Sequence, residues 1–130
     1  MKNKILLIGK FGEYFVAQKN EEGDKLIPSS EKVFAKELIP YGFDFNFGGI
    51  FGENVGIRGY GHEMYKNKGK NRGYPEREEY PEVNLEILIN NLENKVDEKD
   101  ADYILVDDLR YDDANTSWEI SGRAQILIKR

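Results

Sequence analysis

One stretch of the chain predicts an amphipathic helix with a single apolar stripe, and this feature narrows the choice of fold more than any other. Its apolar residues recur at the spacing of one helical face: Leu85, Leu88, Ile89, Leu92 and Val96. Asn84 stands where an N-cap is expected, and Glu86 lies in the first turn, where the helix dipole favours an acidic side chain. Because such a stripe must pack against another layer, the rest of the chain has to supply that layer.

The segments on both sides of this helix have the patterns of strands. Near the N-terminus, KILLIGK and EYFVAQK are rich in β-forming residues and predict two neighbouring strands. The following NEEGDKLIP fits a hairpin loop with Gly23 at positive φ, and then a short strand through Leu26 and Ile27. At the other end, DYILVDDLRY and SWEISGRAQILIKR predict a hairpin whose turn is DDANT.

A second, shorter helix is predicted between these regions. Ser29 and Ser30 can cap it, Phe34 and Leu38 fall on one face, and Pro40 ends it. The sequence FDFNF that follows alternates in the manner of a half-buried strand.

A Gly-rich run extends from Tyr41 to Gly61 and raises the question of whether it wraps a ligand or forms bent strands. A phosphate-binding loop needs closely spaced glycines between a strand and a helix N-terminus, and no helix start follows here. Together with the alternating phenylalanines, this absence favours strands in which glycines mark bends, bulges or close approach of backbones.

The predicted fold class is α+β: a mainly antiparallel sheet with two helices packed on one face and one long loop. The loop covers residues 58–82, where apolar periodicity is lost and the composition permits mobility. At 130 residues the chain has the length of one domain with its own core, so a single domain over residues 1–130 is expected.

Composition removes several kinds of chemistry. The chain has no cysteine and one histidine, His62, which excludes disulfides and thiolate metal sites and leaves zinc without its usual ligands. Asp108, Asp112 and Glu119 have the span of a calcium loop, but Arg110 and Asp113 occupy positions that such a loop needs for other residues. We therefore expect no metal and no cofactor.

The apolar segments are too short for targeting to, or insertion into, a membrane. The run Ile5–Ile8 is shorter than the core of a signal peptide, and no segment approaches the roughly 18 apolar residues of a membrane span. We expect a cytoplasmic protein without membrane contact.

Charge is distributed unevenly along the chain. The formal net charge is −5, but residues 76–119 contain 15 acidic and 4 basic residues, whereas the remainder contains 9 acidic and 15 basic ones. Such asymmetry bears on partners and association rates rather than on the fold.

The acidic region also carries aromatic side chains, which suggests an interface for a basic protein. The candidate partner-binding residues are Glu78, Glu79, Asp107, Asp108, Tyr111, Asp112, Asp113 and Trp118. Carboxylates steer a basic partner and pair with its Arg or Lys, while rigid aromatics supply buried anchors. Our first hypothesis is a small inhibitor or immunity-type protein that blocks a nuclease or nucleic-acid-binding protein; the plainer alternative is a solvated acidic face without a partner.

A second hypothesis is a nucleotide or small anionic-ligand binder that uses the Gly-rich run and the basic loop after it. Its candidate residues are Arg58, Tyr60, His62, Lys68, Lys70 and Arg72. Basic groups neutralise phosphates and tyrosines stack on bases, but the neighbouring EREEYPE would repel a phosphate backbone, so direct nucleic-acid binding is not expected. A third hypothesis, an enzyme, requires His62 to meet Glu63 or Asp108 as an acid/base pair.

Overall fold

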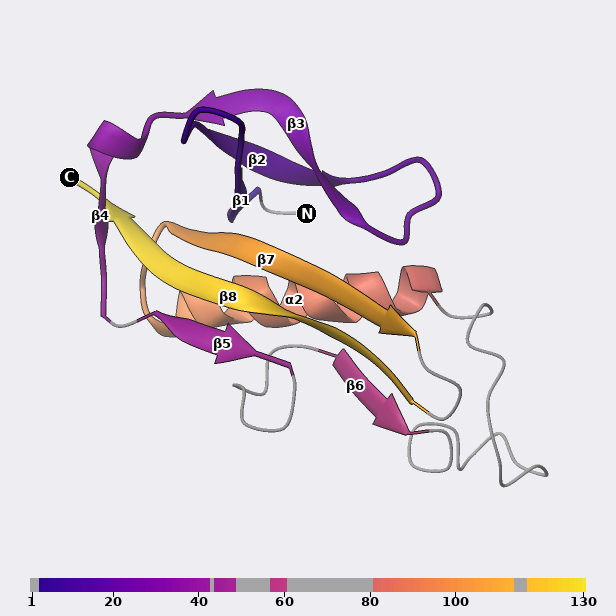
Figure 1. The fold of residues 1–130 in the computed structure, drawn as a ribbon. Coiled ribbons are helices and arrows are strands. Elements are labelled where there is room, and N and C mark those ends of the chain that lie inside the picture. Colours follow the sequence, from indigo (N-terminus) through magenta and orange to yellow (C-terminus); the bar gives the residue numbers. More distant parts are fainter. Residues whose placement is uncertain (1–2, 43, 49–56, 61–80, 114–116) are drawn as a thin grey trace.

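The computed structural model describes residues 3–42, 44–48, 57–60, 81–113 and 117–130 (Figure 1). For residues 57–60, 81–84, 112–113 and 117–119 it describes the backbone alone. These segments form one mixed sheet of eight strands and one long helix, α2, over Pro81–Glu98.

The sheet is built around the long C-terminal hairpin. Its strands are β1 (Ile5–Ile8), β2 (Tyr14–Lys19), β3 (Leu26–Val33), β4 (Leu38–Pro40), β5 (Phe45–Phe47), β6 (Ile57–Tyr60), β7 (Tyr103–Asp113) and β8 (Ser117–Lys129). The order is β3-β2-β1-β7-β8, and β4, β5 and β6 all pair with the outer edge of β8. The pair β1–β7 is parallel, and every other pair is antiparallel. The predicted strand pairs at the two ends of the chain are therefore confirmed.

The predicted second helix is wrong. Ser29 and Ser30 belong to β3, which pairs with β2, and only Ala35–Glu37 form a single 3-10 turn, η1, before β4. Phe34 precedes this turn in an extended conformation and makes no side-chain cap. Two apolar residues at helical spacing give a weak helical preference, and the hydrogen bonds of a neighbouring strand override it.

The predicted long loop is wrong at both of its ends. Arg58 and Tyr60 lie in β6, and α2 begins at Pro81, four residues before Leu85. Proline suits the first turn of a helix because its fixed φ is already helical and its missing N–H has no intrahelical acceptor there. Residues 61–80 lie outside the described part of the chain.

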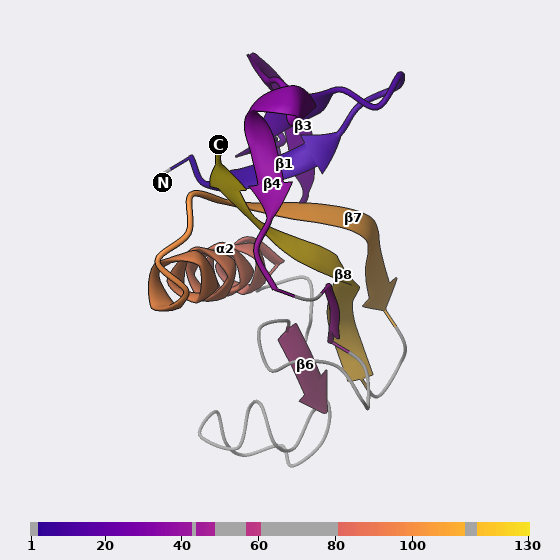
Figure 2. The same cartoon turned by 90° about the vertical axis from the view of Figure 1, so that its left-hand side faces the viewer.

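Two cores lie on opposite faces of the sheet. The stripe of α2 packs on β1, β7 and β8 through residues such as Leu88, Leu92 and Ile104, as the sequence predicted. A smaller core on the other face contains Leu6, Val16, Leu38, Leu105 and Leu127. Alternation along β7 separates the two, since Ile104 and Val106 belong to the first core and Leu105 to the second. Figure 2 shows α2 on one side of β7 and β8, with β1 and β3 curling above them.

The Gly-rich region forms part of an interrupted edge strand. As the chain runs through β4, β5 and β6 it pairs with β8 at successively earlier residues, from Lys129 to Ser117. Gly48 follows β5 at φ 71°, where an added Cβ would lie 2.6 Å from the carbonyl oxygen of Ile120. Phe47, 1% exposed, lies opposite Gly122, which has no side chain to obstruct its ring. Close backbone approach therefore explains the glycine at Gly48, whereas Gly42 takes a positive φ of 88° with no atom within 4 Å of an added Cβ.

Candidate partner-binding site

A hydrogen bond brings two acidic segments together at one end of the molecule. The backbone N–H of Leu26, the first residue of β3, donates to the Tyr111 hydroxyl near the end of β7 at 3.1 Å. The loop between β2 and β3, which contains Glu21, Glu22 and Asp24, therefore lies beside the strand segment that continues into Asp112 and Asp113. We call Glu21, Glu22, Asp24 and Tyr111–Asp113 the acidic end.

The loop between β2 and β3 is ordered by the side chain of Asn20. Its Oδ1 accepts hydrogen bonds from the backbone N–H groups of Asp24 and Lys25 at 3.0 and 3.1 Å, and its Nδ2 donates to the Asp24 carboxylate at 2.8 Å. Gly23 takes φ 74° in this loop, as predicted, and its N–H donates to the carbonyl of Asn20. The tip is thus held in one shape without any contribution from Glu21 or Glu22.

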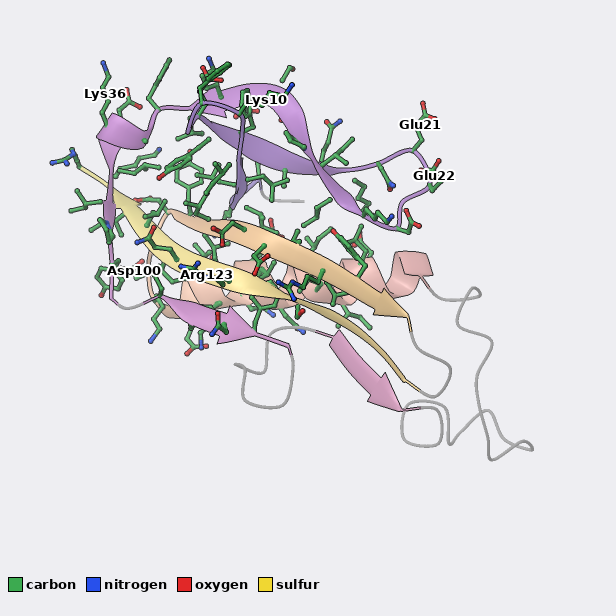
Figure 3. The ribbon with its side chains drawn as sticks, in the orientation of Figure 1. Lys10, Glu21, Glu22, Lys36, Asp100 and Arg123 are labelled. Carbon is green, nitrogen blue, oxygen red and sulfur yellow. The ribbon has the colours of Figure 1, made fainter. Side chains whose placement is uncertain are left out.

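Glu21 and Glu22 stand at the exposed tip of this loop (Figure 3). Neither carboxylate forms an ion pair with a residue in the described part of the chain. The two neighbouring lysines are engaged elsewhere, because Lys19 pairs with Glu86 of α2 and the Lys25 ammonium lies 5.8 Å from the centroid of the Tyr111 ring. The tip therefore presents two carboxylates without an ion-pair partner among the described residues, while the Lys25 ammonium lies beside Tyr111.

The surroundings of Tyr111 raise its pKa above the ordinary value of 10.0. Burial is the largest cause, because the phenolate would lose hydration. The hydrogen bond from Leu26 acts in the opposite direction, and the negative charge of Asp24 adds a smaller upward contribution. Tyr111 packs against the core beneath α2, so it joins the loop to the sheet and is half-buried.

A bulge in β7 separates Asp107 from Tyr111. The pairing with β8 shifts between Asp107 and Arg110, and Asp108 occupies the left-handed region at φ 53°. Val106 before the bulge and Tyr111 after it pack on the same core, so the half-buried Asp107 faces the other side of the sheet, opposite Arg123 in register. The exposed Asp108 carboxylate lies 3.6 Å from Nε of Arg110.

The backbone register places the remaining candidates of the C-terminal hairpin. Asp112 lies opposite Glu119, and Asp113 lies opposite Trp118. Trp118 also pairs with Gly59 of β6, so its backbone is flanked by a strand on each side. Glu78 and Glu79 lie outside the described residues.

Of the residues of the second hypothesis, the structure describes two. Arg58 lies opposite Glu119 and Tyr60 opposite Ser117 in the β6–β8 pair, whereas His62, Lys68, Lys70 and Arg72 lie outside the described residues, as does Glu63. Within the described residues there is no group of three or more His, Cys, Asp or Glu side chains arranged to hold a metal ion. In that same part of the chain, no helix has the length and apolar character needed to cross a bilayer.

Glu21, Glu22 and Asp24 are the functional candidates that sequence reasoning missed. The sequence NEEGD predicts an exposed turn, so its acids were expected at the surface, but nothing in it indicates a neighbour 85 positions away. Their proximity to the end of β7 depends on the parallel pair β1–β7, which brings the β1–β2–β3 meander beside the C-terminal hairpin. Comparisons with protein families, with curated proteins and with solved structures found no match to this chain.

Proposed function

We propose that the protein binds a basic protein through its acidic end and blocks it, as an inhibitor or immunity-type module does. The observation that carries this proposal is the hydrogen bond between Tyr111 and Leu26, which joins the acidic β2–β3 loop to the last residues of β7. Two segments of like charge held side by side produce a stronger local field than either produces alone. A nuclease or nucleic-acid-binding protein is the proposed class of partner, because such proteins carry basic surfaces for phosphates.

The rigidity of the acidic end favours binding over simple solvation. Asn20 holds the loop from within, so ordering Glu21 and Glu22 on binding costs little backbone entropy. Their carboxylates are exposed and have no described ionic partner to give up. A basic partner would therefore gain charge pairs without first breaking existing ones.

The test starts with capture of partners from the native host, using the chain as bait at low salt. A captured protein is then purified, and its association with the chain is measured at increasing ionic strength. We expect the association rate to fall steeply with salt, because exposed charges are screened. If the partner is a nuclease, its activity should fall as the chain saturates it.

Two matched double variants locate the interface. Glu21→Gln/Glu22→Gln removes two charges from the acidic end, and Glu98→Gln/Asp100→Asn removes two exposed charges near the end of α2, well away from that loop (Figure 3). We expect the first variant to weaken binding about tenfold and the second to leave it unchanged. Equal binding by both variants, salt-independent association, or failure to bind any basic protein would show that the acidic end is only a solvated surface.

A further inference from the structure

A hollow of about 670 Å³ lies at the end of the molecule opposite the acidic end. It is open to solvent and is bordered by the end of β3, by η1 and β4, by the start of β7 and by the C-terminal end of β8. Lys36, which lines it, lies far from Glu21 and Glu22 in Figure 3. Its volume is typical of sites that bind small molecules.

The floor of the hollow is apolar. Val33, Leu38 and Tyr103 line it, and all three pack on the smaller core of the sheet. Leu38 is buried, whereas Val33 and Tyr103 are partly exposed and so offer apolar surface to a ligand. A hydrocarbon or aromatic group placed there would cover this surface and gain hydrophobic stabilisation.

The wall formed by the end of β8 presents an oriented guanidinium. Nε of Arg130 donates to the carbonyl of Lys36 at 2.8 Å, and the backbone N–H of Arg130 donates to the carbonyl of Glu37 at 2.9 Å. These bonds fix Arg130 against η1, and its two Nη groups make no hydrogen bond or ion pair within the described part of the chain. A guanidinium held in this way can donate two parallel hydrogen bonds to a carboxylate.

Other charges around the hollow decide how negative its ligand can be. Lys129 lies over the Tyr103 ring at 5.9 Å, and neither Lys36 nor Lys129 is ion-paired with a described residue. Lys32 is already paired with Glu13 at 2.9 Å, and Glu31 and Glu37 also line the hollow. Among the described side chains that line the hollow, three cations without an ion-pair partner stand beside two carboxylates, and this near-balance of charge favours a ligand with a single negative charge over a polyphosphate.

We propose that this hollow binds a small monocarboxylate with an apolar body. The carboxylate accepts from the Nη groups of Arg130 near Lys129, and the apolar body covers Val33, Leu38 and Tyr103. The site shares no residue with the acidic end and does not depend on the proposed partner.

Three related probes separate the contribution of the carboxylate charge from that of the apolar ring. They are phenylacetate, its neutral analogue 2-phenylacetamide, and acetate, which lacks the ring. Amide NMR spectra of the full chain are recorded during titration with each probe. We expect saturable shifts with phenylacetate in the millimolar range, centred on Val33, Leu38, Tyr103 and Lys129. The amide and acetate should each bind about tenfold more weakly, since one loses the charged hydrogen bonds and the other the apolar contact.

The matched control is Arg123, an exposed arginine within β8, the strand that Arg130 directly follows. Arg130→Gln should weaken phenylacetate binding about tenfold, and Arg130→Lys, which keeps the charge, should bind with an affinity between those of Arg130→Gln and the unaltered protein. Arg123→Gln should bind phenylacetate as the unaltered protein does. Far-UV circular dichroism and thermal unfolding verify that each variant is folded. The proposal is overturned by the absence of saturable shifts, by equal binding of phenylacetate and its amide, or by equal binding of the Arg130→Gln and Arg123→Gln variants.

Discussion

Tyr111 and Leu26 are joined by a hydrogen bond although 85 positions separate them in the sequence. The bond forms on the face of the sheet that carries α2, and Tyr111 reaches this face because the bulge between Asp107 and Arg110 shifts the alternation of β7. With unbroken alternation from Val106, Tyr111 would face the other side, together with Asp107. One irregularity in β7 therefore determines which acidic residues lie together.

Removing the Tyr111 hydroxyl should destabilise the protein. In Tyr111→Phe the N–H of Leu26 loses its acceptor, and we expect the free energy of unfolding to fall by about 1–2 kcal/mol. Urea unfolding followed by fluorescence measures this change. Tyr41→Phe is the control, because the exposed Tyr41 side chain makes no hydrogen bond with a described residue. Equal loss in both variants would contradict a specific role for the bond.

The raised pKa of Tyr111 predicts a loss of stability in alkaline solution. A tyrosine whose pKa is higher in the folded state binds its proton more tightly there than in the unfolded state. Its contribution is therefore complete below the ordinary value of 10.0 and is lost as the pH rises through the folded pKa. Unfolding free energies measured from pH 8 upward should fall more steeply for the unaltered protein than for Tyr111→Phe, and parallel profiles would be inconsistent with the raised pKa.

Two glycines of the interrupted edge strand should respond differently to alanine. Both have positive φ, but an added Cβ at Gly42 meets nothing within 4 Å, whereas at Gly48 it meets the Ile120 carbonyl oxygen at 2.6 Å. We expect Gly42→Ala to cost about 1 kcal/mol from backbone strain and Gly48→Ala about 3 kcal/mol, because backbone atoms must also move. Thermal unfolding of the two variants measures the difference, and similar losses would argue against the close approach at Gly48.

Asp108 offers a way to separate backbone strain from charge in partner binding. Glycine adopts the φ of 53° without strain, so Asp108→Gly should leave the free energy of unfolding within about 1 kcal/mol, whereas Asp108→Val should lower it by about 2 kcal/mol. If the carboxylate contributes to the interface, Asp108→Gly should slow association with the basic partner although its stability is retained. Unchanged association would place Asp108 outside the interface.

Local pattern was sufficient to predict some elements of the fold. The stripe from Leu85 to Val96 and the two terminal strand pairs depend on periodicity and turn chemistry between near neighbours. The predicted helix after Ser29 failed because β2 offers that segment long-range hydrogen bonds. The alternation of FDFNF predicted a strand where β5 forms, but no local signal indicates that β5 and β6 pair with the same edge of β8.

The residues that come together at the candidate sites were harder to predict from the sequence than the elements of the fold. Asp107 and Tyr111 are four residues apart, and both were predicted from the sequence to lie on one surface. The bulge between them turns them to opposite faces of the sheet. This bulge contains no glycine, and its one sequence signal is an aspartate, Asp108, a residue type that adopts positive φ more readily than most. The guanidinium of Arg130 and the floor at Val33 and Tyr103 come from three distant segments. Such a convergence is a property of topology, so composition and spacing could not indicate it.

The arrangement of strands on β8 also constrains how the protein can be made. β4, β5 and β6 pair with a strand that begins only at Ser117, and the first strand pairs in parallel with residues 104–106. During synthesis from the N-terminus, those strands emerge from the ribosome long before their partners exist. The sheet therefore closes only after β8 has been synthesised, and until then the β1–β2–β3 meander and the strands β4, β5 and β6 lack their partner along one edge.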